Sequence, residues 1–365
     1  MYKAFTFTKG DNVAIVSLSS GILGDKFCAH QLKLGVKRLK EIGLNPVFMK
    51  NALKGKDYLR KNPKARADDL KEAFLDNSIS GIICAIGGDD TYKIIPWLLE
   101  DYEFINAVKS HPKIFTGFSD STVNHLLLNK LGLITFYGPN FLNDIAELGN
   151  NMLPYTLKYF LGFFNLENLM KIVPSKVWYE ERKDFSSKSI GTERICHQEL
   201  RGFELLQGKK IFSGILMGGC IDSLYSLISG DRYPDEKDIN DKYELVPTGK
   251  KWSGKILFLE TSESKITPED LEIKLNMLKD KGIFNYINGI IVGKPQDEVY
   301  YDEYKNIYKK VVQNIDLPIM YNVNFGHAYP RTILPLGINV KVDANKQCIQ
   351  LLEQPLYNIG EKSNG

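Results

Sequence analysis

The chain has 365 residues, of which 43% are hydrophobic and 25% are charged, a length and composition typical of a globular protein with two domains. Its net charge of +3 comes from interleaved basic and acidic residues, which excludes the concentrated basic element of a nucleic-acid-binding protein and favours a small-molecule partner. No apolar run approaches the roughly 20 residues of a membrane span, and no signal core follows Met1, so we expect a cytoplasmic protein that does not bind membranes.

The cysteines and histidines show no pattern of a disulfide framework or a metal site. The five cysteines are odd in number and lack CxxC spacing, and the five histidines form no HExxH or HxH pair. These residues are Cys28, Cys84, Cys196, Cys220 and Cys348, and His30, His111, His125, His197 and His327. We therefore expect no disulfide framework, no catalytic metal and no cofactor.

The first half of the chain alternates short apolar runs with stretches of helical spacing. Four runs are typical of buried parallel strands: residues 13–18, 46–49, 79–86 and 113–117. Four stretches between and after them predict helices, the first of which is expected to end at Gly43: residues 32–42, 65–76, 92–99 and 123–131. This alternation predicts a parallel sheet covered by helices.

Residues 166–208 break this alternation and are interpreted as a linker with a long substrate loop. Beyond them, one helix is predicted at residues 268–279, and four strands are predicted at residues 256–259, 287–292, 319–323 and 338–342. The pattern predicts three parts: an N-terminal α/β domain over 1–165, the linker over 166–208, and a mixed α/β or α+β domain over 209–365.

Ser119 lies where the fourth predicted strand runs into the following helix, in the segment TGFSDST at residues 116–122. A sharp turn there exposes the hydroxyl, and the start of the helix favours negative charge that develops nearby. The segment resembles a nucleophile elbow, although it lacks the second glycine of GxSxG. The alternative is that Ser119 or Asp120 only caps the helix, because serine and aspartate are preferred there.

Two further polar residues follow predicted strands of the second half. Glu260 ends the strand at 256–259, and His327 lies in the loop after 319–323. Ligands bind at the carboxyl ends of strands in open α/β sheets, so Ser119, Glu260 and His327 together form a candidate nucleophile, acid and base. Glu263 is a rival for the acid, and the local sequence does not choose between the two glutamates.

A glycine pair, Gly87 and Gly88, ends the third predicted strand. Glycines let backbone N–H groups approach a ligand, which suits an oxyanion hole, and a tight turn is the alternative. The sequence AIGGDD has neither GxGxxG nor a P-loop spacing, and Asp89 and Asp90 would repel phosphate. This weighs against a dinucleotide-dependent oxidoreductase, which is the rival enzyme class beside a non-catalytic ligand-binding protein.

Five segments, taken in order, resemble the LD-carboxypeptidase family of serine peptidases, which includes muramoyl-tetrapeptide carboxypeptidases and microcin C self-immunity proteins. They are ARADDLKEAFLD at 65–76, the strand ending at Gly87-Gly88, GFSD at 117–120, LE at 259–260 and GHAYP at 326–330. The resemblance extends from residue 13 to about residue 342. It implies a Rossmann-like N-terminal domain with a parallel sheet, a smaller C-terminal domain, and a homodimer without metal.

The resemblance also implies roles for individual residues. It assigns a Ser-Glu-His triad to Ser119, Glu260 and His327, a backbone oxyanion hole to Gly88 and Asp120, and substrate binding to Gly87. The implied reaction is cleavage of an amide bond at the carboxyl end of a small peptide or aminoacyl-nucleotide conjugate. The implied alternative is LD-carboxypeptidase action on a muramoyl tetrapeptide in cell-wall recycling.

The segment PSKVWYEER at 174–182 resembles the immunity-protein branch, in which an aromatic residue of this loop stacks on a nucleobase. By that resemblance Trp178 takes the stacking role, and a tryptophan that packs in the core is the open alternative. Cys220 stands where the family often has asparagine, which affects the expected substrate pocket and leaves the triad unchanged.

Overall fold

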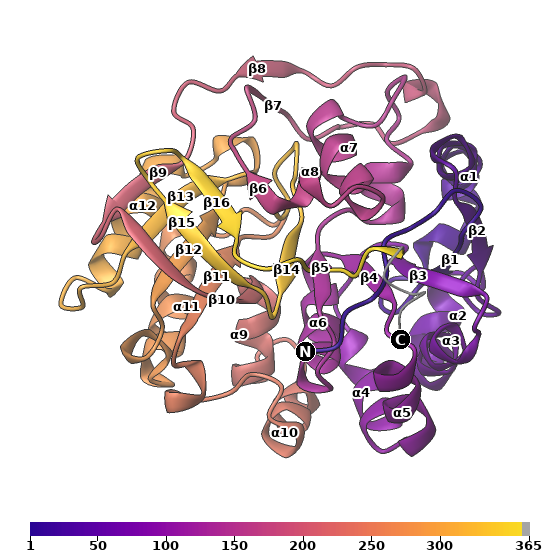
Figure 1. Cartoon of the computed structure of the whole chain (residues 1–365), viewed down its shortest axis with the longest axis horizontal. Coiled ribbons are helices and arrows are strands. Elements are labelled where there is room, and N and C mark those ends of the chain that lie inside the picture. Colours follow the sequence, from indigo (N-terminus) through magenta and orange to yellow (C-terminus); the bar gives the residue numbers. More distant parts are fainter. Residues whose placement is uncertain (360–365) are drawn as a thin grey trace.

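A six-stranded sheet organises the first half of the chain, in a computed structural model that describes residues 1–359 (Figure 1). Its strands are β1 (Asn12–Val16), β2 (Asn45–Phe48), β3 (Ile79–Cys84), β4 (Ile114–Gly117) and β5 (Thr135–Tyr137), together with β14 (Leu334–Leu336) from the far end of the chain. The order is β14-β5-β4-β3-β1-β2, and only the β14–β5 pair is antiparallel. The predicted parallel sheet is confirmed.

Helices accompany these strands. They are α1 (Ala29–Ile42), α2 (Lys56–Lys61), α3 (Pro63–Leu75), α4 (Ile95–Leu99), α5 (Tyr102–Ser110) and α6 (Thr122–Lys130), followed by α7 (Pro154–Phe160) and α8 (Glu167–Met170). Of these, α1, α3, α4 and α6 lie at the predicted positions, whereas α2, α5, α7 and α8 were not predicted. Gly43 ends α1 as expected, because its φ of 102° is a left-handed conformation that glycine adopts without steric cost.

An eight-stranded sheet organises the second half. Its order is β6 (Lys171–Ile172), β16 (Cys348–Leu351), β15 (Asn339–Asp343), β10 (Ile211–Cys220), β11 (Lys255–Glu260), β12 (Gly289–Gly293), β13 (Ile319–Val323) and β9 (Glu204–Gln207). The central strands β10 to β13 are parallel, and antiparallel pairs form both edges. The accompanying helices are α9 (Ile221–Ser229), α10 (Pro234–Tyr243), α11 (Pro268–Asp280) and α12 (Tyr301–Val311).

Several strands join a sheet that lies outside the part of the chain to which the sequence assigned them. Within residues 166–208, β6 and β9 add to the edges of the second sheet, and β7 (Val177–Tyr179) pairs with β8 (Cys196–Gln198) as a separate hairpin. From the second half, β14 joins the first sheet. These strands have two to four residues, too few for an apolar period to be recognised in the sequence. The longer strand β10 escaped prediction because three glycines interrupt its apolar run.

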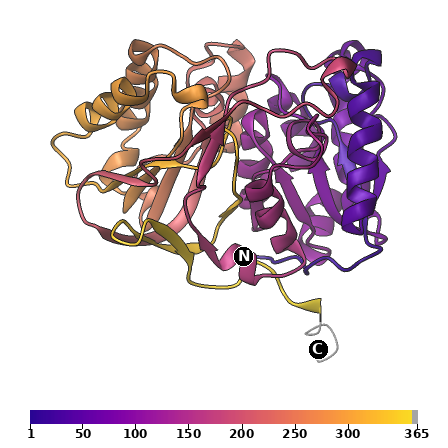
Figure 2. The ribbon, with the colours of Figure 1, turned by 90° about the horizontal axis from the view of Figure 1, so that it is seen from above.

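The hydrophobic core joins the two halves, which lie side by side in Figure 2. In one apolar cluster α6 packs against α9, with Leu126 and Leu224 both buried. In the other, the rings of Tyr137 and Phe258 lie 5.4 Å apart between their centroids. The end of β5 therefore meets β11 at the border between the halves. Across residues 1–359, no helix combines the length and apolar character that crossing a lipid bilayer requires.

Candidate active site

Ser119 occupies a strained turn between β4 and α6. Its φ of 65° lies in the left-handed region, which is uncommon for serine and is typical of residues held at functional turns. Its backbone N–H donates to the hydroxyl of Tyr137 at 3.0 Å. The capping alternative fails, because among residues 1–359 no side chain caps α6. The Asp120 carboxylate instead accepts from Ser19 Oγ at 2.7 Å and Thr91 N at 2.9 Å.

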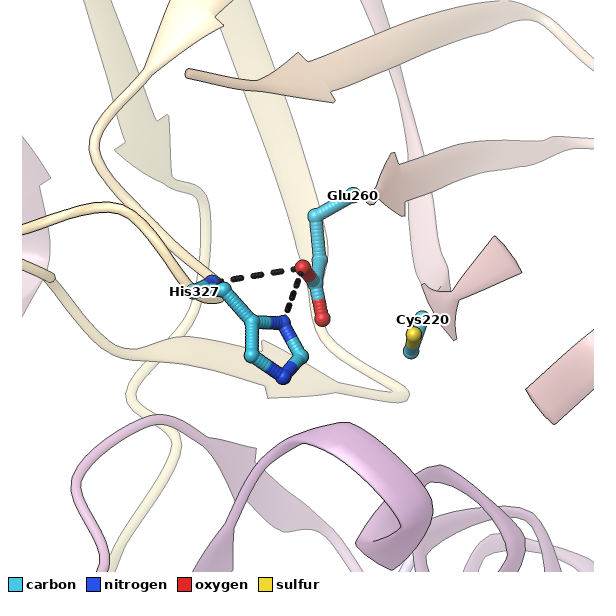
Figure 3. A group of neighbouring side chains, drawn as sticks. All are labelled: Cys220, Glu260 and His327. Atoms are coloured by element: carbon cyan, nitrogen blue, oxygen red, sulfur yellow. Dashed lines mark hydrogen bonds and ion pairs between the residues drawn. The ribbon is translucent and has the colours of Figure 1, made fainter. Parts of the chain in front are cut away.

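Glu260 and His327 form a buried hydrogen-bonded pair. Glu260 Oε2 lies 2.7 Å from Nδ1 of His327 and accepts from the His327 backbone N–H at 3.2 Å (Figure 3). The two side chains are 1% and 8% exposed, respectively. Gly326 lets the loop approach this closely, because at its φ of 82° any Cβ would collide with the Glu260 carboxylate. A buried acid that holds Nδ1 fixes the tautomer and orientation of the ring.

Glu263, the alternative candidate for the triad acid, contacts the other ring nitrogen of His327. Its Oε2 is 2.9 Å from Nε2 of His327, and its side chain is 70% exposed. The hydrogen bond with His327 lowers the pKa of Glu263 to about 2. Burial lowers the pKa of His327, but the two carboxylates outweigh burial and raise that pKa to about 10. The structure thus separates the two glutamates by position, which the local sequence does not.

Tyr137 and Arg331 belong to the site although the sequence did not single them out. The Tyr137 hydroxyl donates to Glu260 Oε1 at 2.6 Å, and burial followed by that carboxylate raises its pKa well above the ordinary value. Arg331 is buried against Asp144 at 3.0 Å and donates to the His327 carbonyl at 3.2 Å. Both residues reach the site through contacts between segments that are distant in the sequence. The one hint in the sequence is that Arg331 lies four residues after His327.

The glycine pair lies directly against the candidate nucleophile. A Cβ on Gly87 would lie 2.7 Å from Cβ of Ser119 and 3.3 Å from the backbone nitrogen of Asp120, so glycine is required there. Among residues 1–359, the N–H groups of Gly88 and Asp120 donate no hydrogen bond to another backbone or side-chain group. Free N–H groups beside a nucleophile are what an oxyanion hole needs.

A cavity of about 660 Å³ opens over these residues. Its lining includes Ser119, His327, Glu263 and both glycines, and its aromatic members are Phe27, Phe118, Phe185 and Tyr329. Trp178 is not among the lining residues; its indole stacks on His197, with ring centroids 4.2 Å apart and planes 17° apart. The ammonium of Lys294 lies 5.1 Å from the indole centroid. Trp178 therefore contacts neighbouring side chains rather than the cavity.

Cys220 completes a group of three potential metal ligands. Its Sγ, a carboxylate oxygen of Glu260 and a ring nitrogen of His327 lie within 4.8 Å of one another (Figure 3). Both oxygens of Glu260 already accept hydrogen bonds, from Tyr137 and from His327. Burial and the Glu260 and Asp222 carboxylates raise the pKa of the Cys220 thiol well above its ordinary value, so the thiol keeps its proton. Because both oxygens of Glu260 already accept hydrogen bonds, the contacts fit a catalytic dyad better than a metal centre.

We expect activity to survive exhaustive treatment with EDTA, because the hydrogen bonds of Glu260 and His327 leave no free ligand set in this group. Hydrolysis rates before and after chelation, with metal content measured on the same samples, check this. If EDTA abolished activity and added zinc restored it, the interpretation of Glu260 and His327 as a metal-free dyad would be wrong. A Cys220→Ser variant serves as control, since a catalytic metal held by the thiol would be lost with it.

Two family models match the chain: the LD-carboxypeptidase N-terminal domain over residues 13–138 and the LD-carboxypeptidase C-terminal domain over residues 213–342. The chain is 49% identical to an MccF-like protein from Streptococcus pneumoniae whose crystal structure contains AMP. That structure superposes with a TM-score of 0.89, over 93% of this chain and 98% of the other.

Two relatives found by sequence carry names that state different functions. The microcin C7 self-immunity protein MccF of Escherichia coli is 26% identical over 331 residues, 88% of each chain. A Bacillus subtilis protein named "Probable murein peptide carboxypeptidase" is 28% identical over 344 residues, 92% of this chain and 90% of the other. The relatives therefore include one named as a self-immunity protein and one named as a probable murein peptide carboxypeptidase.

Proposed function

The chain belongs to the LD-carboxypeptidase family, and from that premise we propose that it is a serine hydrolase that cleaves an amide at the carboxyl end of a small aminoacyl-nucleotide or peptide conjugate. The observation that carries the proposal is the buried Glu260–His327 pair at the same cavity as Ser119. An oriented imidazole that lines the same cavity as a hydroxyl on a strained turn is the arrangement that can activate a weak nucleophile.

In the proposed reaction, neutral His327 accepts the proton of Ser119 as Oγ attacks the amide carbonyl. The tetrahedral oxyanion accepts hydrogen bonds from the free N–H groups of Gly88 and Asp120. Glu260 holds Nδ1 and stabilises the imidazolium that forms at His327. The imidazolium then protonates the leaving nitrogen, and water attacks the acyl-enzyme with His327 again as base.

A direct test uses alanyl sulfamoyl adenosine, in which an amide joins an amino acid to a nucleoside-bearing leaving group. The proposal predicts release of alanine and sulfamoyl adenosine, followed by mass spectrometry, and labelling of Ser119 by a fluorophosphonate. A muramoyl tetrapeptide assayed in parallel measures the alternative, which the similarity to the Bacillus subtilis murein peptide carboxypeptidase favours. Absence of both hydrolysis and labelling would leave a binding protein as the better interpretation.

The nucleotide preference is supported by the Streptococcus pneumoniae relative with AMP and by the aromatic lining of the cavity. Two linker residues are candidates for stacking on the base: Trp178, by its family resemblance, and Phe185, which lines the cavity. The indole of Trp178 is already stacked on His197. A nucleobase in the cavity is therefore within easier reach of Phe185.

We expect Phe185→Ala to raise KM for alanyl sulfamoyl adenosine by roughly five- to 150-fold, because a stacked base contributes about 1–3 kcal/mol. Trp178→Ala is the matched control and should mainly lower Tm through loss of the contact with His197. KM on this substrate and on an alanyl amide without a nucleobase, together with Tm, measures both effects. A base-specific rise in KM for Trp178→Ala alone would assign stacking to Trp178.

Three further expectations go with the proposal. A homodimer and a cytoplasmic location follow from the family resemblance and from the sequence, and size-exclusion chromatography with light scattering tests the first. The reaction needs no cofactor, because nucleophile, base, acid and oxyanion donors are all supplied by the chain.

A further inference from the structure

His327 has a carboxylate on each of its ring nitrogens. Glu260 Oε2 lies 2.7 Å from Nδ1, and Glu263 Oε2 lies 2.9 Å from Nε2. Carboxylates only accept hydrogen bonds, so both ring nitrogens must carry protons for both bonds to form. The ring is then an imidazolium, which cannot accept the proton of Ser119. The hydrolysis proposed above therefore requires one carboxylate to leave.

The two carboxylates are held very differently. Glu260 is 1% exposed, and the Tyr137 hydroxyl also donates to it. Glu263 is 70% exposed, and among residues 1–359 His327 is the only side chain that bonds to its carboxylate. It lies on the loop between β11 and α11, outside both sheets. Glu263 is thus the acid that can move without breaking other contacts.

The position of Glu263 also indicates which substrate group can bind its carboxylate in place of His327. The substrate carbonyl carbon must meet Ser119 Oγ, and Oγ must come within hydrogen-bonding distance of Nε2. An α-amino group is attached two bonds away from that carbonyl carbon. Because Glu263 Oε2 is 2.9 Å from Nε2 and lines the same cavity as Ser119, an α-ammonium lies within its reach.

We propose that Glu263 is a specificity-determining residue, which selects acyl groups with a free α-ammonium because that ammonium takes the Glu263 carboxylate away from Nε2 of His327. The inference rests on the proposed amide hydrolysis. When the ammonium hydrogen-bonds to Glu263, the Nε2 proton passes to water and His327 becomes the neutral base. A substrate with a blocked amine leaves Glu263 on His327, so it binds less tightly and is cleaved more slowly.

The experiment compares alanyl sulfamoyl adenosine with its N-acetyl derivative, which differs only at the α-nitrogen. Binding is measured by calorimetry in a Ser119→Ala background, so that no turnover intervenes. We expect the free amine to bind roughly ten- to 100-fold more tightly, the range that one charge-assisted hydrogen bond supports. Adding Glu263→Gln should bring the two Kd values close together. The matched control is Glu269→Gln, which removes an exposed charge from the start of α11 and should keep the full ratio.

Equal Kd values for the two ligands, or a ratio that Glu263→Gln leaves unchanged, would overturn the inference. Turnover by the enzyme with Ser119 intact is measured separately on the same two compounds. Failure to hydrolyse either of them would count against the proposed reaction, while the binding ratio still reports on Glu263. Hydrolysis of both at equal rates would keep the reaction and reject the role of Glu263.

Discussion

Replacing Ser119 with alanine is expected to lower kcat by roughly five to six orders of magnitude while the Kd of the substrate changes little. The variant lacks the atom that forms the acyl-enzyme, and His327 alone cannot supply it. The residual rate comes from the N–H groups of Gly88 and Asp120 and from substrate positioning, which together are worth roughly 10³–10⁴ over water in such sites. Steady-state kinetics and calorimetry on alanyl sulfamoyl adenosine measure the two quantities.

Ser264→Ala is the matched control for this result. Ser264 is an exposed serine one residue from Glu263, and within the described residues 1–359 its hydroxyl bonds only to Ser262. The Ser264→Ala variant should keep the activity and the Tm of the unaltered protein. If Ser119→Ala turned over at near the rate of the unaltered protein, Ser119 would not be the nucleophile and the mechanism would be wrong.

Replacing Glu260 with glutamine is expected to lower kcat by on the order of 10⁴, the loss typical of removing the acid that orients a catalytic histidine. The Glu260 carboxylate accepts from both Tyr137 and His327, whereas an amide offers one oxygen and must donate from its nitrogen. Glu263→Gln removes a charge from the same ring and should leave kcat much closer to normal. If Glu263→Gln proved the more damaging of the two, Glu263 would be the catalytic acid.

The dependence of kcat/KM on pH tests the role of Glu260 in a second way. His327 must be neutral to act as base, and its pKa of about 10 means that kcat/KM should rise with pH well beyond the ordinary histidine range. Removing the negative charge of Glu260 lowers that pKa, so the acid limb of the profile should move to lower pH while the plateau falls. A plateau that falls without any shift would mean that Glu260 only holds the ring in place.

The sequence predicted the elements that depend on local patterns. Apolar runs located β1, β3 and β4, and Gly43 marked the end of α1, because burial and backbone conformation leave a direct trace in residue type. Ser119 could be found for the same reason, as a small polar residue between a strand and a helix. Its left-handed φ could not, because serine does not require it.

What the sequence could not predict depends on contacts between distant segments. Tyr137 looks like an ordinary strand residue, and only folding brings its hydroxyl to Glu260. The choice between Glu260 and Glu263 is set by which ring nitrogen each carboxylate reaches, since both glutamates lie at or just after the end of β11. Trp178 was singled out for its aromatic ring, but ring type does not reveal that His197 already covers it.

The strand β14 makes the first sheet depend on synthesis of the second half of the chain. It lies close to the end of the chain, just after the His327 loop, yet it pairs with β5 in the first sheet, with Leu334 opposite Tyr137. A ribosome-bound chain that has made the first half therefore carries Ser119 without its proposed base, and with the Tyr137 strand still unpaired on one edge. Synthesis of residues 324–336 supplies both His327 and β14, so the proposed base and the missing edge strand arrive together. The same strand also contacts β10, so β14 ties the two halves of the chain together.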